Sequence, residues 1–130
     1  MSNISSKATH MISAEAYISC QKDINNQSNP GILVLTNFGF VYGKIHKINF
    51  DDKTNVANVL LDTRNKLTEK YVSQGDTMIN DGSHIVIDDA TVKYSNNMTL
   101  NFAQIIILID QIVGYYPVDL SSMDSQLNHQ

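Results

Sequence analysis

The run of five apolar residues at 105–109, IIILI, limits the fold more than any other stretch of this sequence. Successive side chains of a strand point to opposite faces, so both faces of this run need cover. We expect an N-terminal helix or residues 64–83 to cover one face, and a neighbouring subunit to cover the other. Each additional leucine-sized side chain buried there contributes about 2 kcal/mol. This predicts a homo-oligomer whose edge carries Ile105, Ile107 and Ile109.

Short apolar and β-branched runs separated by tight turns indicate strands along most of the chain. Within residues 40–50 the apolar spacing slips by one between Ile45 and Ile48, which predicts a bulge or bend near His46 and Lys47. The strands we expect are 32–35, 40–50, 55–63, 84–94, 99–110 and 112–118.

The N-terminal part of the sequence indicates a short helix that begins near Ser13, a suitable cap, with Glu15 in its first turn. Cys20 falls on the apolar stripe of this helix and is predicted to be buried. Residues 64–83 read as a mixed insertion with one short element and a turn. The sequence thus predicts a mainly β fold, a small bent antiparallel barrel with a short N-terminal helix and an insertion at about 51–82.

The length of 130 residues fits one modest core. We expect a flexible N-terminus at 1–10, a single small β-barrel domain at 11–120 and a disordered tail at 121–130. Cys20 is the only cysteine, so an intrachain disulfide and a cysteine metal cluster are excluded. With neither a signal peptide nor an apolar stretch of about 18 residues, the sequence predicts a cytoplasmic protein without membrane association.

The net charge of −4 argues against general binding to polyanions, because such binding draws its affinity from Lys and Arg. Six of the nine basic residues nevertheless fall between positions 44 and 70. They form either a local basic patch or a solvated pair of strands.

Candidate catalytic groups are few. The neighbouring acids Asp51-Asp52 and Asp88-Asp89 point to opposite faces of a strand, so neither pair shares a proton or chelates one ion by itself. His46 and His84 are each typical of a polar strand surface. The sequence therefore predicts a non-enzymatic protein with no metal and no cofactor.

The stretch VLTNFGFVYGKIHKIN resembles the first motif of the Sm-like family, which includes bacterial RNA chaperones. Asn37 matches the Asp or Asn of the family's turn, Gly43 its strand-two glycine, and Asn49 its Asp six residues later. SHIVIDDATV is similar to the third strand, and IIILIDQIVGYYPV to the fourth and fifth. The resemblance covers about residues 13–118 once 51–82 is treated as an insertion, and SH3-type barrels share part of the pattern.

The resemblance implies a helix followed by a five-stranded bent barrel that closes into rings and binds RNA. Three positions depart from the family pattern: Phe38 at the turn glycine, Ser83-His84 at the base-reading Met-Asn pair, and Asp110-Gln111 at the basic step.

Two functions follow from the sequence. In the first, the chain is an oligomeric binding module for RNA or, if its acidity excludes RNA, for a protein. In the second, it is a structural or assembly subunit that binds protein partners and has no nucleic-acid role. The residues we expect at the nucleic-acid or partner site are Phe38, Tyr42, Lys44, His46, Lys47, Asn49 and His84.

Overall fold

The computed structural model describes residues 6–25, 29–76 and 83–127, and the chain divides into two compact units. One unit joins Met1–His46 to Ser83–Gln130, and the other is Lys47–Gly82. The second unit nearly coincides with the insertion predicted at 51–82. It forms a compact unit within the range 11–120 that we expect to be a single domain.

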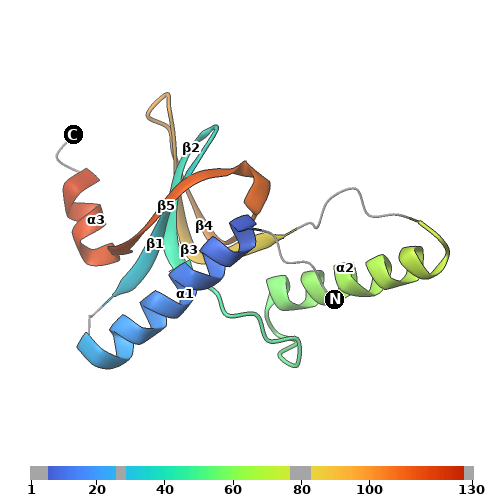
Figure 1. The fold of residues 1–130 in the computed structure, drawn as a ribbon. Coiled ribbons are helices and arrows are strands. Elements are labelled where there is room, and N and C mark those ends of the chain that lie inside the picture. The colour runs from blue at the N-terminus through green and yellow to red at the C-terminus, as the bar shows by residue number, and fades with distance from the viewer. Residues whose placement is uncertain (1–5, 26–28, 77–82, 128–130) are drawn as a thin grey trace. The chain divides into compact units, whose positions relative to one another are not determined.

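The first unit is mainly β, as predicted. Its elements are α1 (Ser6–Asn25), β1 (Pro30–Thr36), β2 (Gly39–Ile45), β3 (His84–Tyr94), β4 (Thr99–Leu108), the 3₁₀ turn η1 (Ile109–Gln111), β5 (Ile112–Asp119) and α3 (Leu120–Leu127). Figure 1 shows the strands as one strongly twisted sheet with α1 beside it.

The sheet is antiparallel throughout, in the order β4-β3-β2-β1-β5. Val34 pairs with Val41, and Val41 pairs with Val92, so one buried row crosses three strands. Among the described strands, β4 and β5 each have a hydrogen-bonded neighbour on one side alone. This confirms the predicted fold class, with a sheet that its own backbone hydrogen bonds leave open between β4 and β5.

The core of this unit is aliphatic. Ile32, Val34, Val41 and Ile87 have no exposed surface. Helix α1 adds buried residues to the same cluster, chiefly Met11 and Ala14. Each fully buried aliphatic side chain stabilises the fold by about 1.5–3 kcal/mol, so the packing of α1 on the strands fixes where the helix lies.

The bend predicted near His46-Lys47 lies earlier in the chain. Pairing between β2 and β3 shifts between Tyr42 and Lys44, where β3 has one residue more than β2. Asp89, in that stretch of β3, has a φ of 51°. Gly43 sits opposite the extra residue. The glycine, which has no side chain, therefore marks the bend, and the slip in apolar spacing between Ile45 and Ile48 does not.

Helix α1 is longer than the sequence predicts, and a further helix follows β5. Helix α1 begins at Ser6, and the Ser13 hydroxyl donates to the Thr9 carbonyl within it instead of capping it. Cys20 is exposed, contrary to prediction, because Met11, Ala14 and Ile18 form the face that packs on the core.

At the other end, Leu120–Leu127 form helix α3 in the tail that we expected to be disordered. The Asp119 carboxylate accepts the Ser121 N–H at 3.0 Å, which satisfies a donor in the first turn of α3. None of the helices in the described ranges is long and apolar enough to span a bilayer.

The second unit contains α2 (Val56–Ser73), so the strand predicted at 55–63 is wrong. Asn55 caps this helix by accepting the N–H groups of Ala57 and Asn58. The buried Asn58 amide accepts the Asn49 N–H at 3.2 Å and donates to the Asp52 carbonyl at 3.4 Å. These bonds close the turn predicted at Asp51-Asp52-Lys53 against the start of the helix.

Candidate functional site

The end of β2 carries a polar cluster that joins three neighbouring strands. His46 Nδ1 lies 2.8 Å from Asp88 Oδ2, and Gln104 Nε2 donates to Asp88 Oδ1 at 2.7 Å. The His46 N–H donates to the Val86 carbonyl, which continues the β2–β3 pairing past Ile45. Because the sheet places β3 between β2 and β4, Asp88 receives one partner from each side.

This cluster gives His46 a fixed orientation. An ionised carboxylate only accepts hydrogen bonds, so the proton of the pair lies on Nδ1 when Asp88 is charged. The His46 side chain is 13% exposed and that of Asp88 is 34% exposed, which leaves the carboxylate edge open to solvent. Lys44 pairs with Asp88 in the strand register and is exposed. The surface at this point is therefore mixed in charge, and not a purely basic patch.

The aromatic residues expected at the site differ in accessibility. Phe38 lies in the turn between β1 and β2, partly exposed, with its ring centroid 5.7 Å from that of Tyr94. Tyr42 is 6% exposed. A base has no access to the Tyr42 ring in this conformation, because the side chain is almost fully buried. Of the two aromatic residues predicted at the site, Phe38 alone has an exposed ring.

Three other predicted residues lie elsewhere. Lys47 is exposed, and it and Asn49 belong to the second unit. The Asn49 side chain accepts the Asp51 N–H at 3.1 Å, so it serves the turn before α2. His84 opens β3, pairs with Leu108 and is half-buried. The structure therefore gathers His46 and Lys44 around Asp88 but does not gather the whole predicted set.

The isoleucines predicted at an oligomer edge face the core of their own chain. Ile107 and Ile109 are buried, and Ile105 packs against the same cluster. The alternation along β4 puts these side chains inward and leaves Leu108 51% exposed. The large apolar side chains that β4 exposes are therefore Leu100, Phe102 and Leu108, and not the three isoleucines.

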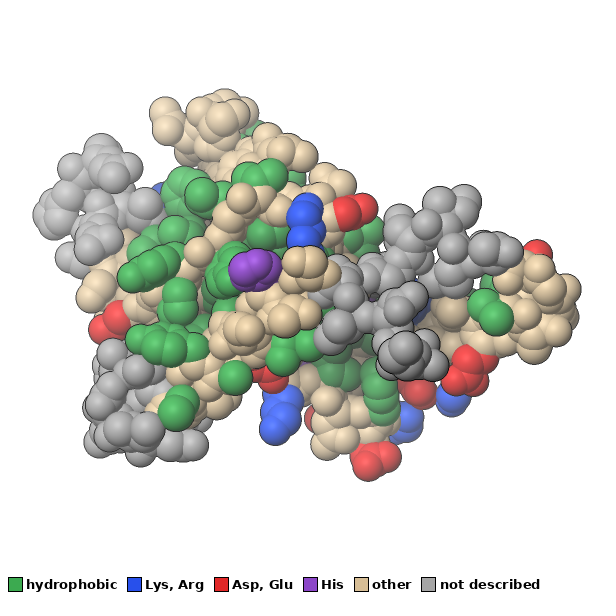
Figure 2. All heavy atoms as spheres, in the orientation of Figure 1, with side chains coloured by type: hydrophobic (Ala, Val, Ile, Leu, Met, Phe, Trp, Pro, Cys, Tyr) green, Lys and Arg blue, Asp and Glu red, His purple; other side chains and the backbone are tan. Residues whose placement is uncertain are grey.

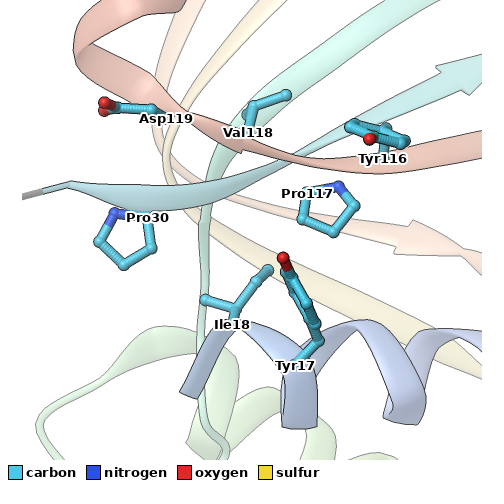
Figure 3. Close-up of a pocket in the computed structure, with 7 residues that line it drawn as sticks. All are labelled: Tyr17, Ile18, Pro30, Tyr116, Pro117, Val118 and Asp119. Atoms are coloured by element: carbon cyan, nitrogen blue, oxygen red, sulfur yellow. The ribbon is translucent and has the colours of Figure 1, made fainter. Parts of the chain in front are cut away.

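A groove lies between α1 and the end of β5, with a volume of about 410 Å³. Figure 3 shows Tyr17 and Ile18 rising from α1 toward the strands, with Pro30 on β1 and Pro117 on β5 beside them. Tyr116, Val118 and Asp119 complete its lining. In the view of Figure 2, hydrophobic side chains gather over this side of the unit with few charged groups among them.

Sequence reasoning missed this groove because its two walls are about a hundred residues apart. Tyr17 is 52% exposed and lies outside the face of α1 that packs on the core. One local signal was present. A proline inside a strand belongs at a sheet edge, so YYP at 115–117 marked β5 as an edge strand with two tyrosines beside it.

Two further properties of the described residues concern metal binding and the pKa of one carboxyl group. No group of three or more His, Cys, Asp or Glu side chains suited to a metal occurs among the described residues. In the second unit, the hydrogen bond from Lys66 holds the pKa of Asp62 below its ordinary value; desolvation opposes this effect, and the neighbouring Lys53 adds to it.

The fold and these surfaces define a mainly β protein with a five-stranded antiparallel sheet, an N-terminal helix and two outer strands. No family model matches the sequence, and no curated protein matches it. Among solved structures, the chain is similar to an Sm protein of Pyrococcus abyssii, determined in complex with a uridine heptamer. The two are 12% identical over 75% of this chain and 94% of the other, with a TM-score of 0.38.

Proposed function

We propose that this chain is a non-enzymatic, Sm-like binding module that assembles with copies of itself through β4 and β5 and binds RNA along strand β2. The observation that carries the proposal is the strand order, in which β4 and β5 are the outer strands of one antiparallel sheet. An outer strand presents unpaired N–H and C=O groups, which are a template for another strand. In a closed assembly, β4 of one copy and β5 of the next form hydrogen bonds between these unpaired backbone groups.

Exposed apolar side chains on the outer strands support this assembly. Leu100, Phe102 and Leu108 lie on β4, and Val113 lies on β5. Val113 is 67% exposed. Burial of such groups between copies adds a hydrophobic contribution to the backbone pairing.

The assignment of RNA as ligand rests on Phe38, Lys44 and His46. Phe38 offers an exposed ring face, which stacks on a base with little sequence preference. Lys44 is exposed on β2, and Asp88 holds the His46 ring beside it. The family resemblance of residues 34–49 points to the same strand.

The alternative is an assembly subunit that binds protein partners. The net charge of −4 and the Asp88 carboxylate beside Lys44 favour it, because both oppose a phosphate backbone.

Fluorescence anisotropy with short single-stranded uridine and adenosine oligonucleotides tests the RNA assignment at low and at physiological salt. We expect binding that weakens as salt rises and is lost in Lys44→Glu/Lys47→Glu. The matched control is Lys7→Glu/Lys70→Glu, which makes the same change in net charge on α1 and α2 and is expected to bind like the parent.

A protein that forms a stable oligomer but binds neither oligonucleotide at low salt contradicts the RNA assignment and supports the protein-partner alternative. Equal losses in both double variants contradict a site on β2, because they indicate a response to net charge alone.

A further inference from the structure

We propose that the groove between α1 and β5 binds a proline-rich peptide segment in the polyproline II conformation, with an Arg or Lys of that segment placed against Asp119. This inference is independent of RNA binding and uses a different part of the first unit. The groove is close to the smaller end of the range of about 300–1,000 Å³ that ligand pockets occupy.

The lining of the groove is dominated by rings. Tyr17 and Pro117 face each other across it, and Pro30 lies on the adjacent strand (Figure 3). Tyr116 stands at the β5 edge and is 71% exposed. Flat tyrosine and proline surfaces form ridges and slots of the kind that receive the rings of a polyproline II helix. Ile18 packs against the core and holds α1 in place as the groove wall.

The tyrosine hydroxyls suit the unsatisfied backbone of such a ligand. A polyproline II segment makes no internal hydrogen bonds, so its carbonyl groups accept bonds from outside. Within the described part of the chain, the hydroxyls of Tyr17 and Tyr116 have no hydrogen-bond partner, whereas the Tyr115 hydroxyl lies 2.6 Å from His10 Nδ1. The two groove tyrosines are thus exposed donors beside apolar rings.

Proline in the groove wall argues against an added β-strand as the occupant. A strand added to β5 requires backbone N–H donors along its edge, and Pro117 has none. A polyproline II ligand needs no ladder of backbone bonds with the wall. The Ile112–Tyr115 part of β5 remains free to pair with another copy. Assembly and peptide binding can therefore use different parts of this strand.

Charge complementarity indicates which charge the ligand carries at one end of the groove. Asp119 lies at one end of the lining, and its Oδ1 accepts the Ser121 N–H. Its Oδ2 has no partner among the described residues. A carboxylate at the end of an apolar groove, in a chain of net charge −4, selects a ligand with a cation at that end.

The test is fluorescence anisotropy with a labelled peptide of eight prolines followed by two arginines, added to the full chain. Two further peptides separate the contributions: one ends in two glutamates, and one replaces the prolines with alternating alanine and glycine. We expect the proline–arginine peptide to bind most tightly. Tyr17→Ala/Tyr116→Ala is expected to weaken it by about tenfold or more, as truncation of buried aromatic anchors does.

Two variants serve as controls. Tyr71→Ala removes an exposed tyrosine of α2 in the second unit and is expected to leave the affinity unchanged. Asp119→Asn keeps an oxygen that accepts the Ser121 N–H but removes the charge. It is expected to abolish the preference for arginine over glutamate without lowering the melting temperature.

Equal affinity for the proline–arginine and the alanine–glycine peptides overturns the proposal. Displacement of the peptide by an oligonucleotide or by anionic vesicles, each added as a competitor, also overturns it and assigns the groove to that competitor. Loss of peptide binding in Tyr71→Ala equal to the loss in the double tyrosine variant contradicts the site itself.

Discussion

Gly43 is a residue of β2 at which the neighbouring strand β3 approaches the backbone closely. A Cβ placed there would lie 2.5 Å from Ile87 Cγ2 and 2.7 Å from the Asp88 carbonyl oxygen. One neighbour is a fully buried side chain and the other is backbone, so neither moves at low cost. The position was identified from the sequence as a strand-two glycine, and the structure supplies the physical reason for it.

Gly43→Ala is therefore expected to reduce the free energy of unfolding by about 1–3 kcal/mol, the usual cost of overpacking. Urea denaturation monitored by tyrosine fluorescence measures it. Gly114→Ala is the control, since its Cβ would meet only the side chain of Leu35, at 3.3 Å. Equal losses in the two variants would show that the approach of β3 to Gly43 has no special role.

The direction in which each strand residue points was less predictable. The extra residue at Asp89 changes which side chains of β3 face the core, so Ile85 and Ile87 before it and Ala90 and Val92 after it are all buried. A strict alternation read from the sequence fails beyond such a bulge.

Helix α2 shows that a run of apolar residues can predict the wrong type of secondary structure. Val56, Val59, Leu60 and Leu61 fit a strand by propensity, and they formed the strand predicted at 55–63. The stronger signal was Asn55, a favoured N-cap, followed by helix-forming residues as far as Ser73. Residues 84–94, with clear turn signals on each side, were predicted with the bounds that β3 has.

Asn55→Ala removes the acceptor of two N–H groups at the start of α2. We expect the stability of this helix to fall by about 0.5–2 kcal/mol, the usual value of an N-cap. Amide hydrogen exchange in the first turn of α2 reports it directly as faster exchange. Asn65→Ala, in the interior of the same helix, is expected to leave this exchange unchanged or slower because alanine has the higher helix propensity.

The ion pairs of Asp62 with Lys53 and Lys66 make the second unit sensitive to acid. Because the folded pKa of Asp62 is lowered, chiefly by the Lys66 hydrogen bond, the pairs stabilise the fold above the unfolded pKa. Their contribution is lost as the pH falls through the lowered value, below the ordinary 3.8.

Asp62→Asn is thus expected to melt at a slightly lower temperature than the parent at pH 7, with the difference shrinking in acid and in high salt. Circular dichroism melts across this pH range measure it. Glu69→Gln makes the same charge change on α2, where the described residues provide no ion pair, and its effect should be smaller. A difference for Asp62→Asn that persists unchanged in strong acid would contradict the assignment.

For the whole molecule, the sequence was sufficient to predict a mainly β chain with an N-terminal helix, because the strands after residue 83 are bounded by turns and rich in β-branched residues. It was not sufficient to predict the groove, since contacts between α1 and β5 join positions far apart in the chain. Nor did it show which side of residues 105–109 remains exposed: Ile107 and Ile109 are buried, whereas Leu108 is exposed.

Association of copies through β4 and β5 is the property of the whole molecule on which the proposed function depends. Val113→Lys and Leu108→Lys place charges on the outer strands, which natural proteins use to prevent strand pairing. We expect both variants to reduce the assembly. Val72→Lys also replaces an exposed apolar residue with lysine, but on α2, and is expected to leave the assembly intact.

Light scattering coupled to size-exclusion chromatography on the parent protein tests this most directly. The account predicts a single species whose mass is several times the 14.5 kDa of one chain and falls in Val113→Lys. A parent protein that elutes at 14.5 kDa at every concentration examined would contradict it.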